Sequence, residues 1–241
     1  MRDGALDSPG SKRVYVRRLF ATIADRYDLI TVLLSFGLDR GWKRRLISLT
    51  GPLPGKHALD LACGTGDITF ALSEHGASVA GLDITYRMVE IAAEKGRLKP
   101  AASRIPHPSF LVGDMMSLPF PDDSFDVVTT GYGLRNVPEL NGALIEIQRV
   151  LRPGGLLLSL DFNRPQNALV RAAYLSYLTV LGGAVGFLLH RDPDTYRYIP
   201  RSIQRYPGAP MVAQMMREHG FSNARWMRVL GGLMAIHVAT K

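Results

Sequence analysis

Two glycines and two acidic residues stand at spacings that suit the binding of a nucleoside. Gly64 and Gly66 flank Thr65 in a short turn, and Asp83 and Asp114 follow further along the chain. Glycine lets a backbone turn tightly and approach a ligand closely, and carboxylates accept hydrogen bonds from hydroxyl and amino groups. A ribose offers two such hydroxyls, and an adenine offers one amino group. These five residues are our first candidates for a binding site.

The turn at Gly64 is compatible with more than one kind of site, and Asp83 helps to separate them. A structural turn needs only the glycines, whereas a dinucleotide site needs a third glycine three residues after the second. That position is Thr69 here (66 + 3). Asp83 lies 17 positions beyond Gly66 (83 − 66), where a carboxylate can accept both ribose hydroxyls. An acid at a strand end can equally cap a helix, so the combination with the turn is what favours ribose binding.

Further candidates lie around this turn. Asp114 can accept a hydrogen bond from an adenine amino group while Met115 packs on the ring, although a cap or turn acid is the alternative for Asp114. Gly131 follows another strand at the edge where we expect the ligand. Asp60 either orients the glycine turn or an amino group of the ligand, or is a buried acid satisfied by backbone amides.

Short apolar runs alternate with helical patterns from residue 55 onward. The predicted strands are residues 57–62, 78–83, 109–114, 125–130 and 156–162. Helical patterns lie between them, at 67–74, through Met88 to Ala92, and at 141–151. Such alternation predicts a parallel sheet with helices on both faces. Right-handed crossovers then bring the carboxyl ends of the strands to one edge, where these sheets bind ligands.

The flanking segments complete the predicted fold. Residues 14–50 show a helical pattern, 210–219 form a last helix, and strands at 224–230 and 233–240 form an antiparallel hairpin joined at residues 231–232. We therefore expect the α/β class, with a doubly wound, mostly parallel, seven-stranded Rossmann-like sheet. A helical N-terminal cap and an apolar helical lid complete it.

The segment 172–189 has no charged side chain and is long enough to raise the question of a membrane span. It also contains Ser176, Thr179 and three glycines. Because these residues lower its hydropathy, we favour a helical lid over a span. An ordinary core helix is an open alternative to contact with a bilayer surface.

Composition limits the compartment and the partners. The chain has 241 residues, a formal net charge of +8 and one cysteine, Cys63. No disulfide can form within the chain, and no apolar stretch typical of a signal peptide follows Met1, so we expect a cytoplasmic protein. The positive charge fits nucleic acid, an anionic membrane face or a solvated surface. Since no nucleic-acid motif accompanies it, we expect no nucleic-acid partner and favour the solvated surface.

The pattern around the glycine turn resembles class I S-adenosylmethionine-dependent methyltransferases. The resemblance runs from Gly55 to about Phe162 and includes residues 59–67, Asp83, 113–115 and 152–155. It implies S-adenosyl-L-methionine as the cofactor and no metal. The residues it assigns to cofactor binding are Gly64, Thr65, Gly66, Asp83, Asp114, Met115 and Gly131.

Segments outside this core resemble a narrower family, the ubiquinone/menaquinone biosynthesis C-methyltransferases. They are FATIADRYD at 20–28, LSFGLDRGWKR at 34–44, YGLRNV at 132–137, YRYIPRSI at 196–203 and GGLMAIH at 231–237. Thr31 departs from the family pattern, which has asparagine there. The resemblance implies methylation of a ring carbon of a polyprenyl quinol, either demethylmenaquinol to menaquinol or the corresponding ubiquinone precursor.

This resemblance gives each part of the chain an expected role. Residues 1–13 are predicted to form a flexible tail, and 14–241 a single methyltransferase domain. Within the domain we expect a helical cap at 14–54, a cofactor-binding core at 55–162 and a substrate lid at 163–206. Residues 207–241 form the closing helix and hairpin.

Arg135 and Asn136 are the predicted catalytic residues, because they follow the fourth strand at the ligand edge. Loss of a ring hydroxyl proton makes the neighbouring carbon nucleophilic, and a fixed arginine can stabilise the resulting phenolate. Asn136 can orient a ring hydroxyl or a water. Alternatively, both residues only shape the loop. The general base is open between a held water and Asp114, and His190 and His237 are expected to be structural.

Two other functions stay open at this point. The same fold can methylate a soluble small molecule, or the chain can be a non-catalytic module that retains the cofactor at a membrane surface. The partners we expect are the polyprenyl quinol and a transient contact with the membrane surface, with a homodimer as an open alternative. Peripheral attachment at the inner face of the cell membrane is a further expectation.

Overall fold

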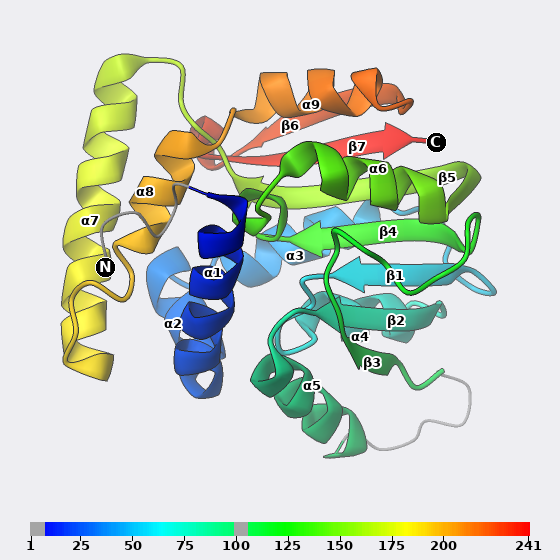
Figure 1. Ribbon diagram of the computed structural model, residues 1–241, viewed down its shortest axis with the longest axis horizontal. Coiled ribbons are helices and arrows are strands. Elements are labelled where there is room, and N and C mark those ends of the chain that lie inside the picture. The colour runs from blue at the N-terminus through cyan, green and yellow to red at the C-terminus, as the bar shows by residue number, and fades with distance from the viewer. Residues whose placement is uncertain (1–7, 99–105) are drawn as a thin grey trace.

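A seven-stranded sheet forms the centre of the molecule (Figure 1), and the computed structural model describes residues 8–98 and 106–241. The strand order is β3-β2-β1-β4-β5-β7-β6. The first five of these strands pair in parallel, and β7 and β6 pair antiparallel. The strands are β1 (His57–Leu61), β2 (Ser78–Asp83), β3 (Ser109–Val112), β4 (Phe125–Gly131), β5 (Leu151–Phe162), β6 (Ser222–Val229) and β7 (Met234–Thr240). This topology confirms the predicted fold class.

The strand order reverses between β1 and β4, because the chain runs outward from β1 to β3 and then returns to pair β4 with β1. The loops that follow β1 and β4 therefore separate at their carboxyl ends and leave a crevice there. The predicted ligand residues lie in these loops and in those after β2 and β3. The crevice is thus the part of the fold that positions the site.

Helices cover both faces of the sheet. Residues of α6 and α9 pack with one face in a large apolar cluster, and residues of α3 and α4 pack with the other. Helix α5 packs against β2 and β3. Their bounds are α3 (Asp39–Ser48), α4 (Asp67–Glu74), α5 (Tyr86–Leu98), α6 (Leu140–Val150) and α9 (Ala209–Glu218). Buried strands without alternating polar residues, such as β1, require this double cover.

Four helices gather beyond the carboxyl ends of the parallel strands, on the left of Figure 1. They are α1 (Pro9–Ile23), α2 (Tyr27–Ser35), α7 (Ala168–His190) and α8 (Tyr198–Arg205). A short 3₁₀ turn, η1 (Ala24–Arg26), joins α1 to α2. Side chains of α1, α2 and α7 pack together with Met88 of α5 and Tyr196. These helices form the predicted cap and lid over the crevice.

The predicted tail at 1–13 is wrong for residues 9–13, which form the start of α1. The Ser8 hydroxyl accepts from the Ser11 amide, the Ser11 hydroxyl accepts from the Ser8 amide, and Pro9 occupies the first turn. A capping box followed by proline is a helix start, so this end of the chain carries its own signal. Residues 1–7 of the predicted tail lie outside the described residues.

Three further boundaries differ from the prediction. Helix α3, placed in the cap by sequence, packs against the sheet through Leu46 and Ile47. Strand β5 begins at Leu151 rather than 156, because Leu151 pairs with Phe125 before a bulge. Helix α8 was not predicted within the lid. The hairpin of β6 and β7 is confirmed, joined through a 3₁₀ turn, η3 (Leu230–Gly232).

Candidate active site

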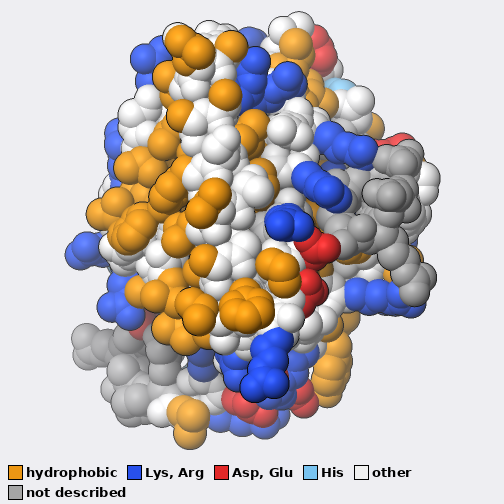
Figure 2. All heavy atoms as spheres, turned by 90° about the vertical axis from the view of Figure 1, so that its left-hand side faces the viewer, with side chains coloured by type: hydrophobic (Ala, Val, Ile, Leu, Met, Phe, Trp, Pro, Cys, Tyr) orange, Lys and Arg blue, Asp and Glu red, His pale blue; other side chains and the backbone are white. Residues whose placement is uncertain are grey.

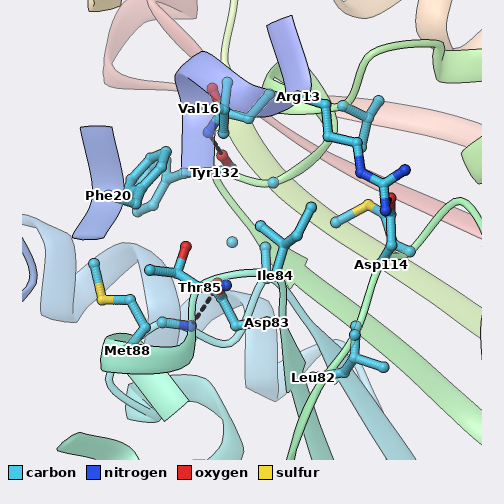
Figure 3. A pocket seen from close by; sticks show the side chains of 18 of the residues that line it. Arg13, Val16, Phe20, Leu82, Asp83, Ile84, Thr85, Met88, Asp114 and Tyr132 are labelled. Atoms are coloured by element: carbon cyan, nitrogen blue, oxygen red, sulfur yellow. Dashed lines mark hydrogen bonds and ion pairs between the residues drawn. The ribbon is translucent and has the colours of Figure 1, made fainter. Parts of the chain in front are cut away.

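A first cavity lies at the carboxyl ends of the parallel strands, beneath α1 (Figure 3). Five of the predicted ligand residues line it: Gly64, Asp83, Asp114, Met115 and Gly131. Arg13, Val16 and Phe20 of α1 lie across the cavity from Asp83 and Thr85. The structure therefore brings together residues from four separate strand ends, as the sequence predicted.

Asp83 is held rigidly at the wall of this cavity. Its Oδ2 accepts from the Gly64 amide at 3.0 Å, and its Oδ1 accepts from the Thr85 amide at 2.8 Å. The residue is 8% exposed, and burial raises the pKa of its carboxyl against the effect of these bonds. Each oxygen keeps a lone pair that no backbone amide uses, so the carboxylate can also accept from a ligand diol.

The two glycines of the turn are required for different reasons. Gly64 has φ +54° and its α-carbon faces the Tyr27 ring, which a Cβ would meet at 3.6 Å. Gly66 has φ +92°, and a Cβ there would lie 2.8 Å from the Phe70 ring. Gly66 does not line the first cavity, so its glycine serves packing and the start of α4 rather than close approach to a ligand.

Thr65 also acts indirectly. Its hydroxyl donates to Asp28 at 2.6 Å, and the residue is 2% exposed. Since Asp28 belongs to α2, this bond joins the glycine turn to the helical cap. Thr65 lines a small recess beside the first cavity rather than the cavity itself.

Asp114 and Met115 lie at the other end of the first cavity. The Asp114 carboxylate accepts from the Met116 amide at 3.0 Å and pairs with Arg13 at 2.9 Å. With Arg13 in this position the cavity holds about 70 Å³, less than a nucleoside needs. The Arg13 side chain is 56% exposed, so its ion pair with Asp114 can break at little cost and leave the carboxylate free for a ligand.

The recess beneath the glycine turn contains Asp60 and Lys43. Asp60 accepts from the Thr69 hydroxyl at 2.6 Å and the Thr129 hydroxyl at 2.9 Å. Burial raises its pKa to about 7, although both hydroxyls favour the charged form. Side-chain hydroxyls are therefore the main partners of this acid, with a smaller contribution from the Thr69 amide. The recess thus places a carboxyl group with a pKa of about 7 beside the glycine turn.

Two residues at the crevice have strained backbones. Ala62, after β1, has φ +52°, and Tyr132, after β4, has φ +61°. A positive φ is uncommon for alanine and unfavourable for a bulky residue, and such strain clusters at functional sites. Nearby Gly131 leaves no room for a Cβ, which would lie 2.6 Å from Ile68. The chain thus turns sharply away from both strands that border the crevice.

A second cavity of about 340 Å³ adjoins the first. Its walls come from α1, α2, α7 and α8 and from the turn before β7, and most of its lining side chains are apolar. Phe20, Tyr27 and Tyr132 line both cavities. The two spaces therefore share one aromatic wall, and groups bound on either side of it can come close together.

Tyr132 and Tyr27 in this shared wall are fixed from α2 and α3. The Tyr132 hydroxyl donates to Asp39 at 2.5 Å, and Asp39 pairs with Lys43 at 2.7 Å. Burial and the Asp39 carboxylate raise the pKa of Tyr132 well above its usual range, and burial raises that of Tyr27 to about 12. Both rings therefore stay neutral near pH 7.

Arg135 lines the second cavity but is not a free cation. Its Nε donates to Asp161 at 3.2 Å, its Nη1 donates to Ser202, and its guanidinium carbon lies 5.0 Å from the centre of the Phe162 ring. Burial raises the pKa of Asp161, and Arg135 opposes that rise. Within the described residues Nη2 has no protein partner. The arginine can therefore offer the N–H donors of Nη2 to a ligand while staying fixed.

Asn136 lines the first cavity, and both ends of its amide bind protein. Nδ2 donates to the Tyr132 carbonyl at 2.7 Å, and Oδ1 accepts from the Tyr198 hydroxyl at 2.9 Å. One donor and one acceptor position stay available on the amide. In the structure its main effect is to lock the turn after β4 to α8.

Several residues of the site escaped the sequence argument. From the sequence, Asp161 has no predicted role beyond its place at the end of the predicted strand 156–162, and neither Tyr198 nor Ser202 within the segment 196–203 has one. Lys12, in the predicted tail, donates to the carbonyls of Arg135 and Val137 at 3.1 and 2.5 Å. The sequence did hold one indication of a role for Asp161. It is an acid at a strand end, and Arg135, which follows another strand, had no predicted partner.

The other residues weighed as bases lie away from the second cavity. Asp114 lines only the first cavity and is paired with Arg13. His237 is buried in β7, its Nε2 bonds the Ala209 carbonyl at 3.0 Å, and burial lowers its pKa to about 4. His190 bonds the Tyr196 hydroxyl at 2.9 Å at the end of α7. Neither histidine lines either cavity. Asp114 is therefore not placed to take a proton from a ligand there.

Comparison with known sequences gives one consistent family. The sequence model of the ubiE/COQ5 methyltransferase family matches residues 9–241. The chain is 38% identical over 230 residues to the ubiquinone/menaquinone biosynthesis C-methyltransferase UbiE of Teredinibacter turnerae, covering 94% of this chain and 91% of that one. It is 36% identical over 229 residues to the UbiE of a Shewanella species, covering 94% and 90%.

Comparison with solved structures confirms the fold. An S-adenosylmethionine-dependent methyltransferase from Thermotoga maritima, described as a possible histamine N-methyltransferase, superposes with a TM-score of 0.65. It is 18% identical and covers 93% of this chain and 99% of its own. A methyltransferase from Methanococcus maripaludis gives a TM-score of 0.65 at 19% identity, covering 92% and 93%. At these identities the likeness concerns architecture alone.

Proposed function

Because the chain belongs to the ubiE/COQ5 methyltransferase family, we propose that it methylates a ring carbon of a polyprenyl quinol with S-adenosyl-L-methionine. Its relatives carry the name ubiquinone/menaquinone biosynthesis C-methyltransferase. The observation that carries the proposal is the second cavity, a largely apolar space that shares Phe20, Tyr27 and Tyr132 with the first. A quinol ring at that wall, with its isoprenoid tail among the helices, fits this arrangement.

The residues of the first cavity fit the cofactor. Asp83 is a fixed, buried carboxylate with lone pairs free for a ribose diol. Met115 offers an apolar surface to an adenine ring, and Asp114 becomes available to its amino group when Arg13 moves away. Asp60 lines the recess beside Gly64, where it can attract an ammonium group. Bound S-adenosyl-L-methionine supplies a methyl group that is already activated as a sulfonium.

In the proposed reaction the protein prepares the second substrate. Removal of a ring hydroxyl proton gives a phenolate, whose negative charge extends to the neighbouring ring carbon. That carbon accepts the methyl group from the sulfonium sulfur, which becomes a neutral thioether. The same carbon then loses its hydrogen as a proton to water and the oxygen regains one, which restores the quinol. Arg135 stabilises this oxyanion through Nη2, and Asp161 and Ser202 fix the guanidinium in place. Such preorganised donors stabilise developing charge without reorganisation at the moment of reaction.

Asn136 supports the same step from the cofactor side. Its amide connects the turn after β4 to Tyr198, and a spare donor or acceptor can hold a water that takes the hydroxyl proton. The helical cap and the Tyr27 and Tyr132 rings exclude bulk water from the shared wall, which strengthens the interaction of Arg135 with the phenolate. Positioning of the ring against the methyl donor then supplies much of the rate.

Methyl transfer assays with matched substrates test this proposal. We expect turnover of demethylated naphthoquinols or benzoquinols, with a lower KM for molecules that carry a prenyl tail. Leu178 is 6% exposed and lines the second cavity, so Leu178→Trp fills part of the tail's space. We expect it to raise KM about tenfold, about 1.4 kcal/mol, for long-tailed quinols only. Leu178→Met, which conserves volume, is the control.

A soluble methyl acceptor is the competing outcome of that assay. If short, tail-free quinols or unrelated small molecules react as well as prenylated ones, and Leu178→Trp changes nothing, the quinol assignment is wrong. Cofactor binding without turnover of any quinol would instead support a non-catalytic module. Mass spectrometry of the extracted quinones, after expression in a strain that lacks the methylation step, identifies the natural ring.

A prenylated substrate also bears on location. Such a molecule resides in the bilayer, so we propose that the enzyme works at the inner face of the cell membrane through a transient, peripheral contact. Within the described residues, α7 is the one helix long and apolar enough to cross a membrane. A homodimer is a separate alternative, in which a second copy of the chain would cover the exposed face of α7.

A further inference from the structure

The side chains that α7 exposes are mostly apolar, together with the uncharged Ser176 and Thr179. Leu169, Val180, Phe187 and Leu188 are between 62% and 82% exposed, and Arg171 is the one charged residue of the helix other than the terminal His190. Of the most apolar stretch of α7, 28% is buried within the protein. An ordinary surface helix turns charged residues to water, so this face calls for a partner.

The mouth of the second cavity opens on the same side. Among its lining residues, Phe36 is 71% exposed, Leu38 48%, Leu230 46% and Tyr177 of α7 42%. These four side chains form the rim of the cavity, because they line it and also reach solvent. Seen from this side, apolar side chains run over α7 and onto the neighbouring surface (Figure 2). The exposed face of α7 and the entrance to the cavity are therefore continuous.

The charges around this face favour an anionic partner. Arg40, two residues after Leu38 of the rim, and Arg191, directly after α7, are exposed and have no acidic partner within 4 Å among the described residues. Figure 2 shows Lys and Arg side chains at the top and bottom of this face.

Three acids of the same region pair with cations of the protein, whereas Asp192, next to Arg191, is exposed and forms no ion pair within the described residues. Asp25 pairs with Arg87 at 2.6 Å, Asp28 pairs with Lys95, and Asp39 pairs with Lys43 at 2.7 Å. The surface thus combines apolar side chains with a basic border, as expected at the headgroup boundary of an anionic bilayer.

The packing of α7 excludes a position across the membrane. Its inner face is fixed to the protein through Tyr174, Leu178 and Val185. Gly182 and Gly186 bring the helix so close to the segment after it that a Cβ would lie 3.2 Å from Tyr196 and 2.6 Å from the Asp192 carbonyl. A helix held this tightly against polar loops cannot be surrounded by lipid on all sides. It can lie in the plane of the interface with one face buried.

We propose that α7 and the end of α2 form a monotopic docking face on anionic bilayers, with the rim of the second cavity pressed into the headgroup layer. A prenylated quinol can then pass from the bilayer into the cavity without crossing water. This inference rests on the proposed function for its purpose, but the docking itself can be measured without any substrate.

Vesicle flotation with the full chain tests the docking face. We expect the protein to float with vesicles of phosphatidylcholine and phosphatidylglycerol, less with phosphatidylcholine alone, and less at high salt. Val180→Asp and Leu188→Asp alter side chains that are 74% and 77% exposed. Each should lower the affinity for anionic vesicles by roughly tenfold or more, since a buried apolar side chain contributes about 1.5–3 kcal/mol.

Ile145→Asp is the matched control, because Ile145 is 55% exposed on α6, away from this face. It should float like the unmodified protein. All three variants should keep the melting temperature and the turnover of a tail-free quinol, so a failure to dock is distinguishable from a failure of the proposed reaction.

Three results would overturn the inference. Equal flotation of Val180→Asp, Leu188→Asp and Ile145→Asp would place the contact elsewhere. Retention in the membrane after an alkaline carbonate wash would indicate a spanning helix. A dimer in sedimentation analysis that dissociates in Val180→Asp, with no binding to either vesicle, would show that a second copy of the chain covers this face.

Discussion

The first cavity is walled by the ends of neighbouring strands, whereas the second is walled by helices from distant parts of the chain. In the first, Asp83 is fixed by backbone amides of Gly64 and Thr85, which lie on adjoining strand ends. In the second, residues of α1, α2, α7 and α8 meet only because the cap and lid fold over the sheet. In the first cavity the key ligand residue is a carboxylate fixed by backbone amides, whereas the second cavity is defined by the packing of mostly apolar side chains.

Because of this difference, the two cavities should tolerate amino-acid substitutions to different extents. A site fixed by backbone amides depends on single residues, because no neighbour can replace a carboxylate in a fixed position. A cavity between helices depends on total volume and polarity, and it tolerates many apolar substitutions. We therefore expect a single substitution in the first cavity to abolish the binding of one ligand. Apolar substitutions in the second cavity should change substrate affinity gradually.

Among these variants, Asp83→Ala should have the largest effect. If its effect is small, the comparison between the two cavities is wrong. The variant loses two charge-assisted hydrogen bonds to the ribose, which contribute about 1.5–3 kcal/mol each, so cofactor affinity should fall at least about a hundredfold. Isothermal titration calorimetry measures the affinity, and thermal unfolding checks the fold.

Asp126→Ala is the control for Asp83→Ala, since Asp126 is an acid on the same sheet at the opposite end of β4. Its affinity for the cofactor should be that of the unmodified protein. Unchanged affinity in Asp83→Ala would remove the ribose assignment and, with it, the contrast between the cavities.

The residues of the first cavity could be predicted from the sequence, because they follow the ends of strands that the hydrophobic pattern predicts. Asp83, Asp114 and Gly131 required only the positions of the predicted strands and the rule that parallel strands end at one edge. The roles of Gly66 and Thr65 were less readable. Gly66 packs against Phe70 and Thr65 bonds to Asp28, and neither contact follows from the local pattern.

Arg135→Lys should have the next largest effect, and it tests whether the second cavity depends on any single residue. Lysine keeps the charge but cannot reach Asp161, Ser202 and a substrate oxyanion together. Loss of one preorganised donor costs about a hundredfold in kcat, so we expect that fall with cofactor affinity unchanged. Single-turnover assays with a tail-free quinol measure it.

Asp161→Asn separates positioning from charge in the same experiment. If Asp161 serves to orient Arg135, the variant should show an intermediate kcat, an unchanged KM and a shifted pH profile. A variant with the kcat of the unmodified enzyme, or an Arg135→Lys enzyme that turns over normally, would assign both residues to structure only.

The second cavity was mostly unreadable because its walls depend on how helices pack. The sequence placed apolar segments at 14–54 and 172–189, yet it gave no means to align Leu19, Leu178 and Leu233 around one space. Arg135 was found from its place after β4, but its ion pair with Asp161 and the support from α8 required the fold. Local patterns report elements, and contacts between distant elements need the tertiary structure.

Asp60→Asn should have the smallest effect. It tests whether the recess beside the first cavity contains an acid that titrates near pH 7. Burial raises the pKa of Asp60 from 3.8 to about 7. The folded protein then holds a proton that the unfolded chain has lost, so this group's stabilisation is full below about pH 4 and is lost as the pH rises through about 7. Asparagine mimics the protonated acid and does not titrate.

The measurement is the free energy of unfolding of both proteins from about pH 2 to about pH 8, so that it includes the range in which Asp126 titrates. Asp60→Asn should gain about 1 kcal/mol or more relative to the unmodified protein across that range, since one unit of pKa shift corresponds to about 1.4 kcal/mol. Asp126→Asn should behave oppositely. There burial raises the pKa, but the His57 amide and Arg152 together outweigh burial and lower it, so this group's stabilisation is present above the usual pKa and lost as the pH falls. Parallel curves for the two variants would mean that the recess beneath the glycine turn is hydrated, and that its acid has an ordinary pKa.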